Sequence, residues 1–310
     1  MPNYQGVWSL SEQYQNAGIW PVVLSGDIGL FGGGYNTTNL IDYINIASTG
    51  NATDFGDLTV ARYYLTACSS DTRGLFGGGL PGATNVIDYV TIRTQGDATY
   101  FGDLTDVSGT LASCSSSTRG LFGGGNGVGD LNVISYVTIA SVGNATDFGD
   151  LTSARSGLAA CSSPTRGVFA GKYTAGNVID YVTIASAGNA TDFGDLTVAR
   201  GSLSSSSSST RGIFGGGWAS TFRVNTIDYI TIASAGNATD FGDLIAQRNY
   251  PVSCSSATRS VFGGGNTSGG AVNSIDYITI ATTSNASDFG DLTVARYGGG
   301  ACSSSHGGLA

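Results

Sequence analysis

The chain repeats a pattern of about 46 residues six times, and this periodicity limits the folds that it can adopt. Phe-Gly-Gly-Gly, or a close variant, begins at Phe31, Phe76, Phe122, Phe169, Phe214 and Phe262. Each copy is followed by Ile-Asp-Tyr and then by Asp-Phe-Gly-Asp; Ser135 and Tyr100 each replace an aspartate once. Because one such unit is too small to bury its apolar side chains alone, the six units must pack against one another.

The spacing inside the repeat is constant except in one segment. The first position of Asp-Phe-Gly-Asp lies 12 residues after the Ile-Asp-Tyr aspartate position in all six repeats, and the next Phe-Gly-Gly-Gly phenylalanine lies 22 residues later in all five internal cases. The segment between that phenylalanine and Ile-Asp-Tyr varies from 11 to 14 residues. Since surface loops tolerate insertions, this segment is predicted to be an exposed loop.

Each repeat contains four short strand patterns, separated by Gly- and Asn-rich turn signals. In the second repeat the first three strands are expected at 63–70, 72–77 and 86–92, and the fourth strand of the first repeat centres on Phe55 and Leu58. Residues 86–92 are apolar on both faces, which indicates a sheet packed between two other sheets. No segment has the 3.6-residue apolar period of a helix. The sequence therefore predicts an all-β fold, a six-bladed β-propeller of four-stranded antiparallel blades.

Closure of the ring is predicted to use the C-terminal strand. The first repeat has no inner strand ahead of residues 27–32, whereas the strand pattern at 297–304 has no further strands after it. If this last strand completes the first blade, no sheet edge is left free. We therefore expect the propeller to comprise residues 21–310 and to follow a short N-terminal segment, residues 1–20.

The order Ile-Asp-Tyr, Asp-Phe-Gly-Asp-Leu, Ala-Arg and Leu-Phe-Gly-Gly-Gly resembles the kelch repeat. Kelch repeats have a double glycine that ends the second strand, a tyrosine and an aromatic residue at set offsets, and an arginine that opens the first strand. The resemblance covers roughly residues 27–308 and implies a kelch-like propeller. Phenylalanine replaces the usual kelch tryptophan at Phe55, Phe101, Phe148, Phe193, Phe241 and Phe289.

Repeated charged residues are candidates for structural ion pairs. One set of arginines opens the inner strands, at Arg62, Arg155, Arg200, Arg248 and Arg296. The aspartates that begin Asp-Phe-Gly-Asp are Asp54, Asp147, Asp192, Asp240 and Asp288. An anion-binding ring is one interpretation of the arginines. The favoured one is that each planar guanidinium pairs with a repeat aspartate or with loop carbonyls, and the pairing is assigned to these aspartates.

Two motifs within the repeat invite functional interpretations that their surroundings do not support. Asp-Phe-Gly is also a kinase signature, but the phosphate-binding loop, strand lysine and catalytic loop of kinases are missing. Asp54 and Asp57 could bind calcium, although the fuller calcium-loop pattern is absent, so a turn is favoured. The Asn-Ala-Thr phrases are formally glycosylation acceptors and are interpreted as turns; they begin at Asn51, Asn144, Asn189 and Asn237.

Five cysteines occupy one repeat position, which is predicted to lie on the innermost strand; they are Cys68, Cys114, Cys161, Cys254 and Cys302. Equivalent positions on neighbouring inner strands are expected to lie farther apart than the roughly 7 Å that a disulfide allows between Cα atoms. Free, buried thiols are therefore predicted.

Charge and composition exclude several functional classes. The formal net charge is −9 and the chain has one lysine, Lys172, so nucleic acid is not an expected partner. The one histidine, His306, leaves no Ser-His-Asp triad and no multi-histidine metal site. No apolar run is long enough to predict a membrane span, and the first residues lack the signal-peptide pattern. We expect no catalytic activity, no cofactor and no bound metal.

Sequence divergence is predicted to gather on one face of the ring. In an up-and-down blade, the variable loop and the connection to the next blade emerge on the same face, and both diverge between repeats. Loops on a rigid scaffold commonly carry binding. The candidate binding residues on this face are Tyr35, Tyr63, Tyr64, Tyr173, Trp218, Phe222, Arg223 and Tyr250. Neutral drift in loops with few packing constraints is the alternative explanation.

The segment Gly-Val-Trp-Ser-Leu-Ser-Glu-Gln-Tyr-Gln at 6–15, followed by Trp20 and Pro21, resembles the N-terminal segment of tail-fibre and other virion proteins of bacteriophages, including phages of cyanobacteria. The resemblance implies a virion appendage protein, with this segment as the anchor to other tail proteins and the propeller in contact with a host glycan or protein. A lectin-like carbohydrate-binding propeller is the alternative. Trp8 and Trp20 could instead plug one end of the propeller.

Overall fold

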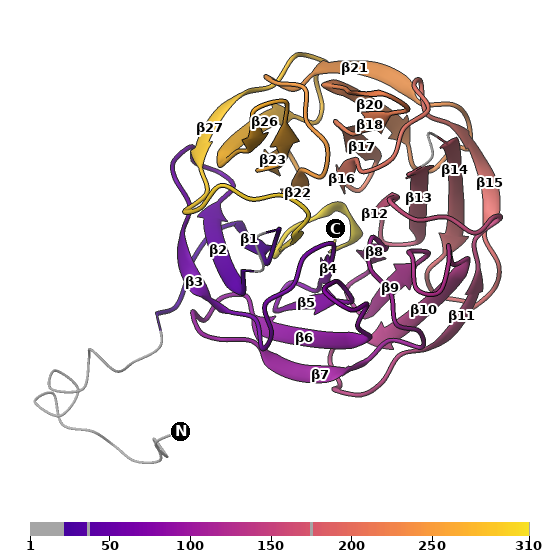
Figure 1. Cartoon of the computed structure of the whole chain (residues 1–310), viewed down its shortest axis with the longest axis horizontal. Helices are drawn as coiled ribbons and strands as arrows, with labels where there is room; N and C mark the ends of the chain where they lie inside the picture. Colours follow the sequence, from indigo (N-terminus) through magenta and orange to yellow (C-terminus); the bar gives the residue numbers. More distant parts are fainter. Residues whose placement is uncertain (1–21, 36–37, 174–175, 310) are drawn as a thin grey trace, which may run out of the picture.

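The computed structural model describes residues 22–35, 38–173 and 176–309, which form a closed six-bladed β-propeller (Figure 1). Each blade is a four-stranded antiparallel sheet, as predicted, and a short 3₁₀ turn, η2 (Gly307–Leu309), follows the last strand. Within the described part of the chain, no helix is long and apolar enough to cross a membrane. The predicted anchor segment and both of its tryptophans lie outside the described residues.

Within each blade the four strands are called A, B, C and D in their order from the axis to the rim. Blade 1 comprises β28 (Gly300–Ser303), β1 (Ile28–Gly32), β2 (Leu40–Asn45) and β3 (Thr53–Asp57). Blade 2 comprises β4 (Thr66–Ser69), β5 (Arg73–Gly77), β6 (Val86–Thr91) and β7 (Thr99–Asp103). Blade 3 comprises β8 (Ala112–Ser115), β9 (Arg119–Gly123), β10 (Val133–Thr138) and β11 (Thr146–Asp150). Blade 4 comprises β12 (Ala159–Ser162), β13 (Arg166–Lys172), β14 (Gly176–Thr183) and β15 (Thr191–Asp195).

The last two blades carry extra hairpins in their B–C loops. Blade 5 comprises β16 (Ser204–Ser207), β17 (Arg211–Gly215), β20 (Thr226–Thr231) and β21 (Thr239–Asp243). Blade 6 comprises β22 (Val252–Ser255), β23 (Arg259–Gly263), β26 (Ser274–Thr279) and β27 (Ser287–Asp291). The hairpins are β18 (Trp218–Ala219) with β19 (Phe222–Arg223), and β24 (Asn266–Thr267) with β25 (Gly270–Ala271).

The predicted closure is confirmed, because β28 pairs antiparallel with β1 and supplies the inner strand of blade 1. The predicted two-sided burial of strand C is also confirmed. Val90 of β6 and Ile92, which follows the strand, pack in one core cluster with residues of blade 1, and Ile87 packs in another with residues of blade 3. Each blade thus packs apolar side chains against both neighbouring blades, which is why no single repeat could fold alone.

Close contact between blades explains several repeated small residues. A Cβ at Gly32 would lie 2.6 Å from the Phe76 ring of the next blade, so the glycine leaves room for the phenylalanine of Phe-Gly-Gly-Gly. A Cβ at Gly74 would lie 2.9 Å from the Cys302 sulfur. All five cysteines are buried and free, as predicted, and burial raises the pKa of Cys114 and Cys302 to about 12. They are inert packing residues.

At the junction of blades 5 and 6, both residues of this cysteine–glycine contact are replaced by serine. In blade 6 Ser260 stands where the other blades have glycine, and in blade 5 Ser206 stands where the others have cysteine. The two hydroxyls form a buried hydrogen bond. The extra side chain at the glycine position is therefore matched by a smaller, polar partner.

Six serines form a closed ring of hydrogen bonds at the end of the inner strands. Each hydroxyl donates to the backbone carbonyl of the equivalent serine in the preceding blade, at 2.6 to 2.8 Å. The ring runs through Ser69, Ser115, Ser162, Ser207, Ser255 and Ser303. Hydrogen bonds in a chain polarise one another, so each member depends on the others. Ser303 belongs to the closing strand β28, and its bonds to Ser69 and Ser255 join this strand to blades 2 and 6.

The outer edge of each blade is covered by the C–D turn of the next. The Gly96 and Ala98 amides donate to the Phe55 and Asp57 carbonyls of β3, and the Asp57 amide donates to the Asp97 carboxylate. At four other junctions the same acceptor is the asparagine of an Asn-Ala-Thr phrase; these are Asn51, Asn144, Asn189 and Asn237. The predicted turns are confirmed, and they protect edge strands that would otherwise be open to pairing.

Removal of the closing strand tests the contribution of closure. A chain that ends after Arg296 leaves the β1 edge unpaired and breaks the serine ring. We expect its Tm to fall by roughly 10 °C or more, since 1 kcal/mol corresponds to about 2–4 °C in a domain of this size. Thermal unfolding followed by circular dichroism measures the change. A chain that ends after Ser305 keeps β28 and is the matched control; equal Tm values for the two truncations would contradict the prediction.

Candidate functional site

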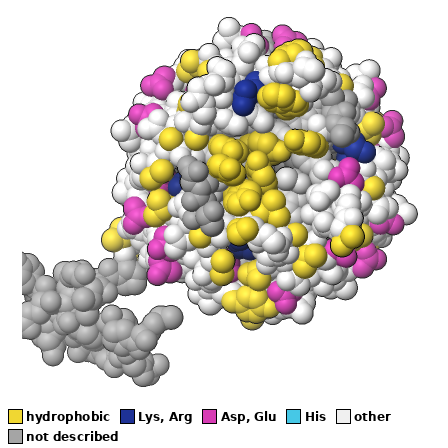
Figure 2. All heavy atoms as spheres, in the orientation of Figure 1, with side chains coloured by type: hydrophobic (Ala, Val, Ile, Leu, Met, Phe, Trp, Pro, Cys, Tyr) yellow, Lys and Arg dark blue, Asp and Glu magenta, His cyan; other side chains and the backbone are white. Residues whose placement is uncertain are grey.

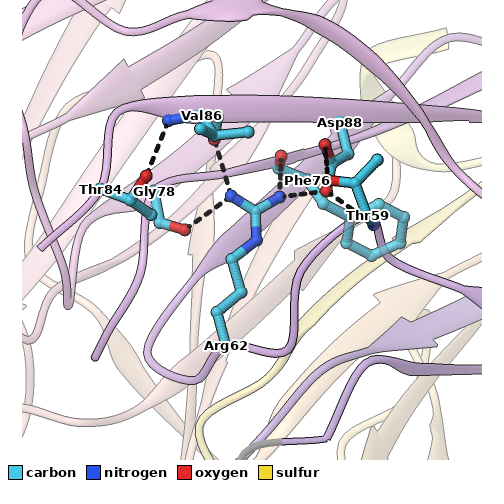
Figure 3. Close-up of polar contacts among 7 residues, drawn as sticks. All are labelled: Thr59, Arg62, Phe76, Gly78, Thr84, Val86 and Asp88. Atoms are coloured by element: carbon cyan, nitrogen blue, oxygen red, sulfur yellow. Dashed lines mark hydrogen bonds and ion pairs between the residues drawn. The ribbon is translucent and has the colours of Figure 1, made fainter. Parts of the chain in front are cut away.

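The repeated arginines are buried, and each bonds to at least one backbone carbonyl and to an aspartate of the blade that follows it. Arg62 donates from Nη1 to the Gly78 and Val86 carbonyls at 3.0 and 2.7 Å, and from Nη2 to the Phe76 carbonyl at 3.0 Å (Figure 3). Nη2 also pairs with the Asp88 carboxylate at 2.8 Å. Burial lowers the pKa of Arg62, and Asp88 opposes that shift.

The ion pairs use a different aspartate from the one predicted. The partners are the Ile-Asp-Tyr aspartates, in the pairs Arg62–Asp88, Arg155–Asp180, Arg200–Asp228, Arg248–Asp276 and Arg296–Asp42, at 2.7 to 3.0 Å. The Asp-Phe-Gly-Asp aspartates are exposed on the outer strand and form none of these pairs: Asp54, Asp147, Asp192, Asp240 and Asp288. Asp42 and Asp54 are cross-strand partners in the C–D pairing, but Asp42 on strand C is fully buried, whereas Asp54 on the outer strand is exposed.

The third blade lacks this ion pair, and the way in which it is lost supports the pairing between the arginine and the Ile-Asp-Tyr aspartate. Ser108 replaces the arginine and Ser135 replaces its aspartate, so both partners are lost in the same blade. A small cavity lies there, lined by both serines. Loss of one partner would leave a buried charge without compensation, whereas loss of both removes the charges together. The five remaining arginines are buried, and each already pairs with an aspartate and with at least one backbone carbonyl, so the anion-ring interpretation is not supported.

Most of the predicted binding tyrosines meet at the centre of the face that carries the B–C loops and D–A connections. Tyr35 stacks on Tyr297 with ring centroids 4.7 Å apart, and Tyr63 meets Tyr35 edge to face at 5.3 Å. Tyr64 contacts Tyr63 at 5.0 Å and Tyr250 at 4.5 Å. These five residues, which we call the tyrosine cluster, come from four separate segments of the chain. Figure 2 shows hydrophobic side chains, tyrosine included, gathered across the middle of this face.

A ring of backbone hydrogen bonds underlies the tyrosine cluster. Six equivalent residues, one from each D–A connection, have φ between 53° and 67°: Tyr64, Thr110, Gly157, Ser202, Tyr250 and Gly298. The amide of each donates to the carbonyl of the equivalent residue in the preceding blade. We call this closed circle the mouth ring. It is the counterpart of the serine ring at the opposite end of the inner strands.

Four residues of the mouth ring other than glycine are strained, and Tyr64 and Tyr250 are the bulkiest of them. Tyr64 and Tyr250 have φ of 55° and 53°, a left-handed conformation that costs about 1–2 kcal/mol for residues other than glycine. Gly157 and Gly298 occupy the same position in other blades without this cost. Burial raises the pKa of Tyr64 and Tyr250, so both hydroxyls remain protonated at neutral pH.

The mouth ring frames an axial well of about 120 Å³. Its wall consists of the first residues of the inner strands and the residues just before them, including Thr66, Ser113, Ser204 and Ser253. Tyr64 and Tyr250 line its entrance. Every described residue that lines the well has an uncharged side chain.

The C-terminus closes the other end of the channel. His306 lines a smaller axial cavity of about 50 Å³, and its Nε2 lies 2.9 Å from the Ser69 carbonyl. A Cβ at Gly308 would lie 1.9 Å from the Ser115 carbonyl, so only glycine fits beside the inner strands. Burial lowers the pKa of His306, which favours a neutral imidazole. The well is therefore open on the face of the B–C loops, and the C-terminal residues block the opposite end of the channel.

The remaining predicted residues belong to the B–C loops and lie outside the tyrosine cluster. Trp218, Phe222 and Arg223 belong to the β18–β19 hairpin, where the Arg223 guanidinium lies 5.2 Å from the Trp218 ring and its Nε donates to Asn249 at 3.0 Å. Phe222 and Tyr173 are exposed. The structure thus divides the predicted set into a central tyrosine cluster, the neighbouring Tyr173, which contributes to the raised pKa of Tyr64 and Tyr250, and the residues of the β18–β19 hairpin.

Three residues of the site are missing from the sequence-based set. Tyr297 occupies the same D–A position as Tyr63 and could have been included on that ground. Ser204 and Ser253 carry no such signal, because serine is common throughout the inner strands. No known family model matches the chain, and no curated protein matches it.

A double-mutant cycle on one buried ion pair tests whether the third blade shows a compensated loss. Arg200→Ser and Asp228→Ser each leave one buried charge unpaired and are expected to cost about 3–5 kcal/mol. The double variant reproduces the pair found in blade 3 and should cost clearly less than the sum of the single changes. Urea unfolding measures the three apparent free energies of unfolding. Additive costs would show that the partners act independently.

Proposed function

We propose that the chain is a non-enzymatic attachment protein of a phage tail or appendage, a kelch-like propeller that holds its partner on the face of the tyrosine cluster. The strain in the mouth ring carries this proposal. Tyr64 and Tyr250 keep a conformation that glycine adopts freely at the same place in other blades. Strain of this kind gathers at functional sites, where a side chain is retained despite its cost to folding.

The chemical character of the face supports binding. Tyrosine offers a large, rigid contact area with a polar end, and it loses little conformational entropy when it binds a partner. The tyrosine cluster is supported by a closed ring of backbone hydrogen bonds. A rigid platform lowers the entropic cost of association.

The position of the first described residues also fits the proposal. Val23 bridges Thr94, and the Leu24 amide donates to the Arg93 carbonyl, in a C–D turn at the opposite end of the blade from the B–C loops. An anchor on the preceding segment would therefore leave the tyrosine face directed away from the attachment point. The resemblance of that segment to phage virion proteins supports a location in the tail.

A lectin-like propeller is the second candidate. Uncharged lining, tyrosine rings and hydroxyl groups at one entrance are the features that suit a saccharide. The two candidates share the same face and differ in the partner, which is a virion or host protein in the first case and a glycan in the second.

Substitutions that keep the mouth ring but remove its tyrosines test the binding role. Tyr64→Gly together with Tyr250→Gly reproduces the residues of two other blades, so we expect folding stability to change by no more than about 2 kcal/mol. Binding of the labelled protein to cells of the phage host should fall at least tenfold, as measured by flow cytometry. Val142→Ala, on an exposed turn of the opposite face, is the control and should bind like the unchanged protein.

The location is tested separately on phage particles. Gold-labelled antibody against the chain should mark the tail or its appendages in electron micrographs. Particles without label, or full cell binding by the double glycine variant, would contradict the attachment role.

A further inference from the structure

We infer that the axial well is a binding site for an uncharged polyol group, such as the hydroxymethyl arm of a terminal sugar, held by Ser204 and Ser253. The inference rests on the proposed function, since it assigns a ligand class to one part of the same face. It depends first on two polar groups that have no partner. The hydroxyls of Ser204 and Ser253 are buried, with exposures of 6% and 9%, and neither makes a hydrogen bond within the protein.

The opposite side of the ring supplies an internal comparison. Ser204 and Ser253 occupy the same strand positions in blades 5 and 6 as Thr66 and Ser113 occupy in blades 2 and 3, as shown by their partners on strand B. Thr66 and Ser113 satisfy each other with a hydrogen bond of 2.7 Å. The two pairs are half a turn apart, so the hydroxyls on one side of the well satisfy each other and those on the other side have no partner within the protein.

An unsatisfied hydroxyl at this depth disfavours folding. A buried polar group without a partner loses the hydrogen bonds that it made to water, whereas alanine at the same place would lose none. Ala159 and Ala160 occupy these two strand positions in blade 4, so the ring accepts small apolar residues there. The two serines are therefore best explained by a partner that enters the well.

The lining selects the chemistry of that partner. No charged side chain occurs among the described residues of the well, and a buried ion without a counter-charge is strongly disfavoured. A neutral group with several hydroxyls can donate to and accept from the two serines. The Tyr64 and Tyr250 rings at the entrance offer flat surfaces for the apolar C–H face of a sugar ring.

The size of the well limits what can enter. A cavity of about 150 Å³ holds one benzene molecule, so a well of about 120 Å³ accepts a group of roughly five or six heavy atoms. A complete oligosaccharide cannot fit, and the C-terminal turn blocks passage through the channel. The terminal arm of a sugar would enter while its ring remained against the tyrosines.

Saturation-transfer difference NMR tests the inference with named probes. Glycerol and the methyl glycosides of glucose, galactose and mannose represent neutral ligands; glucuronate and glucosamine represent charged ones. We expect transfer to at least one neutral probe, strongest at its hydroxymethyl protons, and none to the charged probes. Absence of transfer to every neutral probe would overturn the inference, while loss of host-cell binding in the Tyr64→Gly/Tyr250→Gly protein would still support the wider attachment role.

Matched double variants assign the effect to the two serines. Ser204→Ala/Ser253→Ala should weaken binding of the positive probe about tenfold or more, because both hydrogen-bonding groups are lost. Its Tm without ligand should equal or exceed that of the unchanged protein. Ser206→Cys/Ser260→Gly restores the cysteine–glycine contact of the other blade junctions, lies outside the residues that line the well, and should keep the affinity within about threefold. Equal affinity for the unchanged protein and the Ser204→Ala/Ser253→Ala variant would overturn the assignment.

Discussion

The architecture depends on cyclic hydrogen bonding around the propeller axis. The serine ring and the mouth ring each join all six blades, and each is complete only when β28 lies beside β1. In each ring every residue donates one hydrogen bond and accepts another through its carbonyl, so the loss of one member weakens its neighbours. The repeat has little freedom at these positions, which accounts for serine at one position of every inner strand.

This rigid frame separates stability from recognition. The buried arginine pairs, the aromatic core and the two rings hold the blades together, while the B–C loops and D–A connections change length and composition between repeats. The tyrosine cluster is assembled from segments that are far apart in the sequence, Tyr35 and Tyr297 among them. No single loop contains the site, so only the closed ring creates it.

The sequence predicted the architecture well, because the constant spacing and the two-sided apolar pattern of residues 86–92 leave few alternatives. It also placed Tyr63 and Tyr64 on the correct face. It failed on the partner of Arg62, because the two aspartates of the repeat recur with equal regularity, and only the packed blades show that the strand C position, as at Asp42, is buried while the outer-strand position, as at Asp54, is exposed. The joint replacement of arginine by Ser108 and of aspartate by Ser135 was the available signal. Ser204 and Ser253 could not have been selected, since their significance lies in the hydrogen bonds that they lack.

Hydrogen exchange of the closing strand measures the cyclic closure most directly. If β28 is an integral part of blade 1, the amides of residues 300–303 exchange as slowly as those of the inner strand β12, because both open only when the ring opens. Fast exchange of these amides beside a slowly exchanging β12 would mean that the C-terminal strand is only loosely attached. The serine ring and the mouth ring would then not be closed by β28, and they could not support the site.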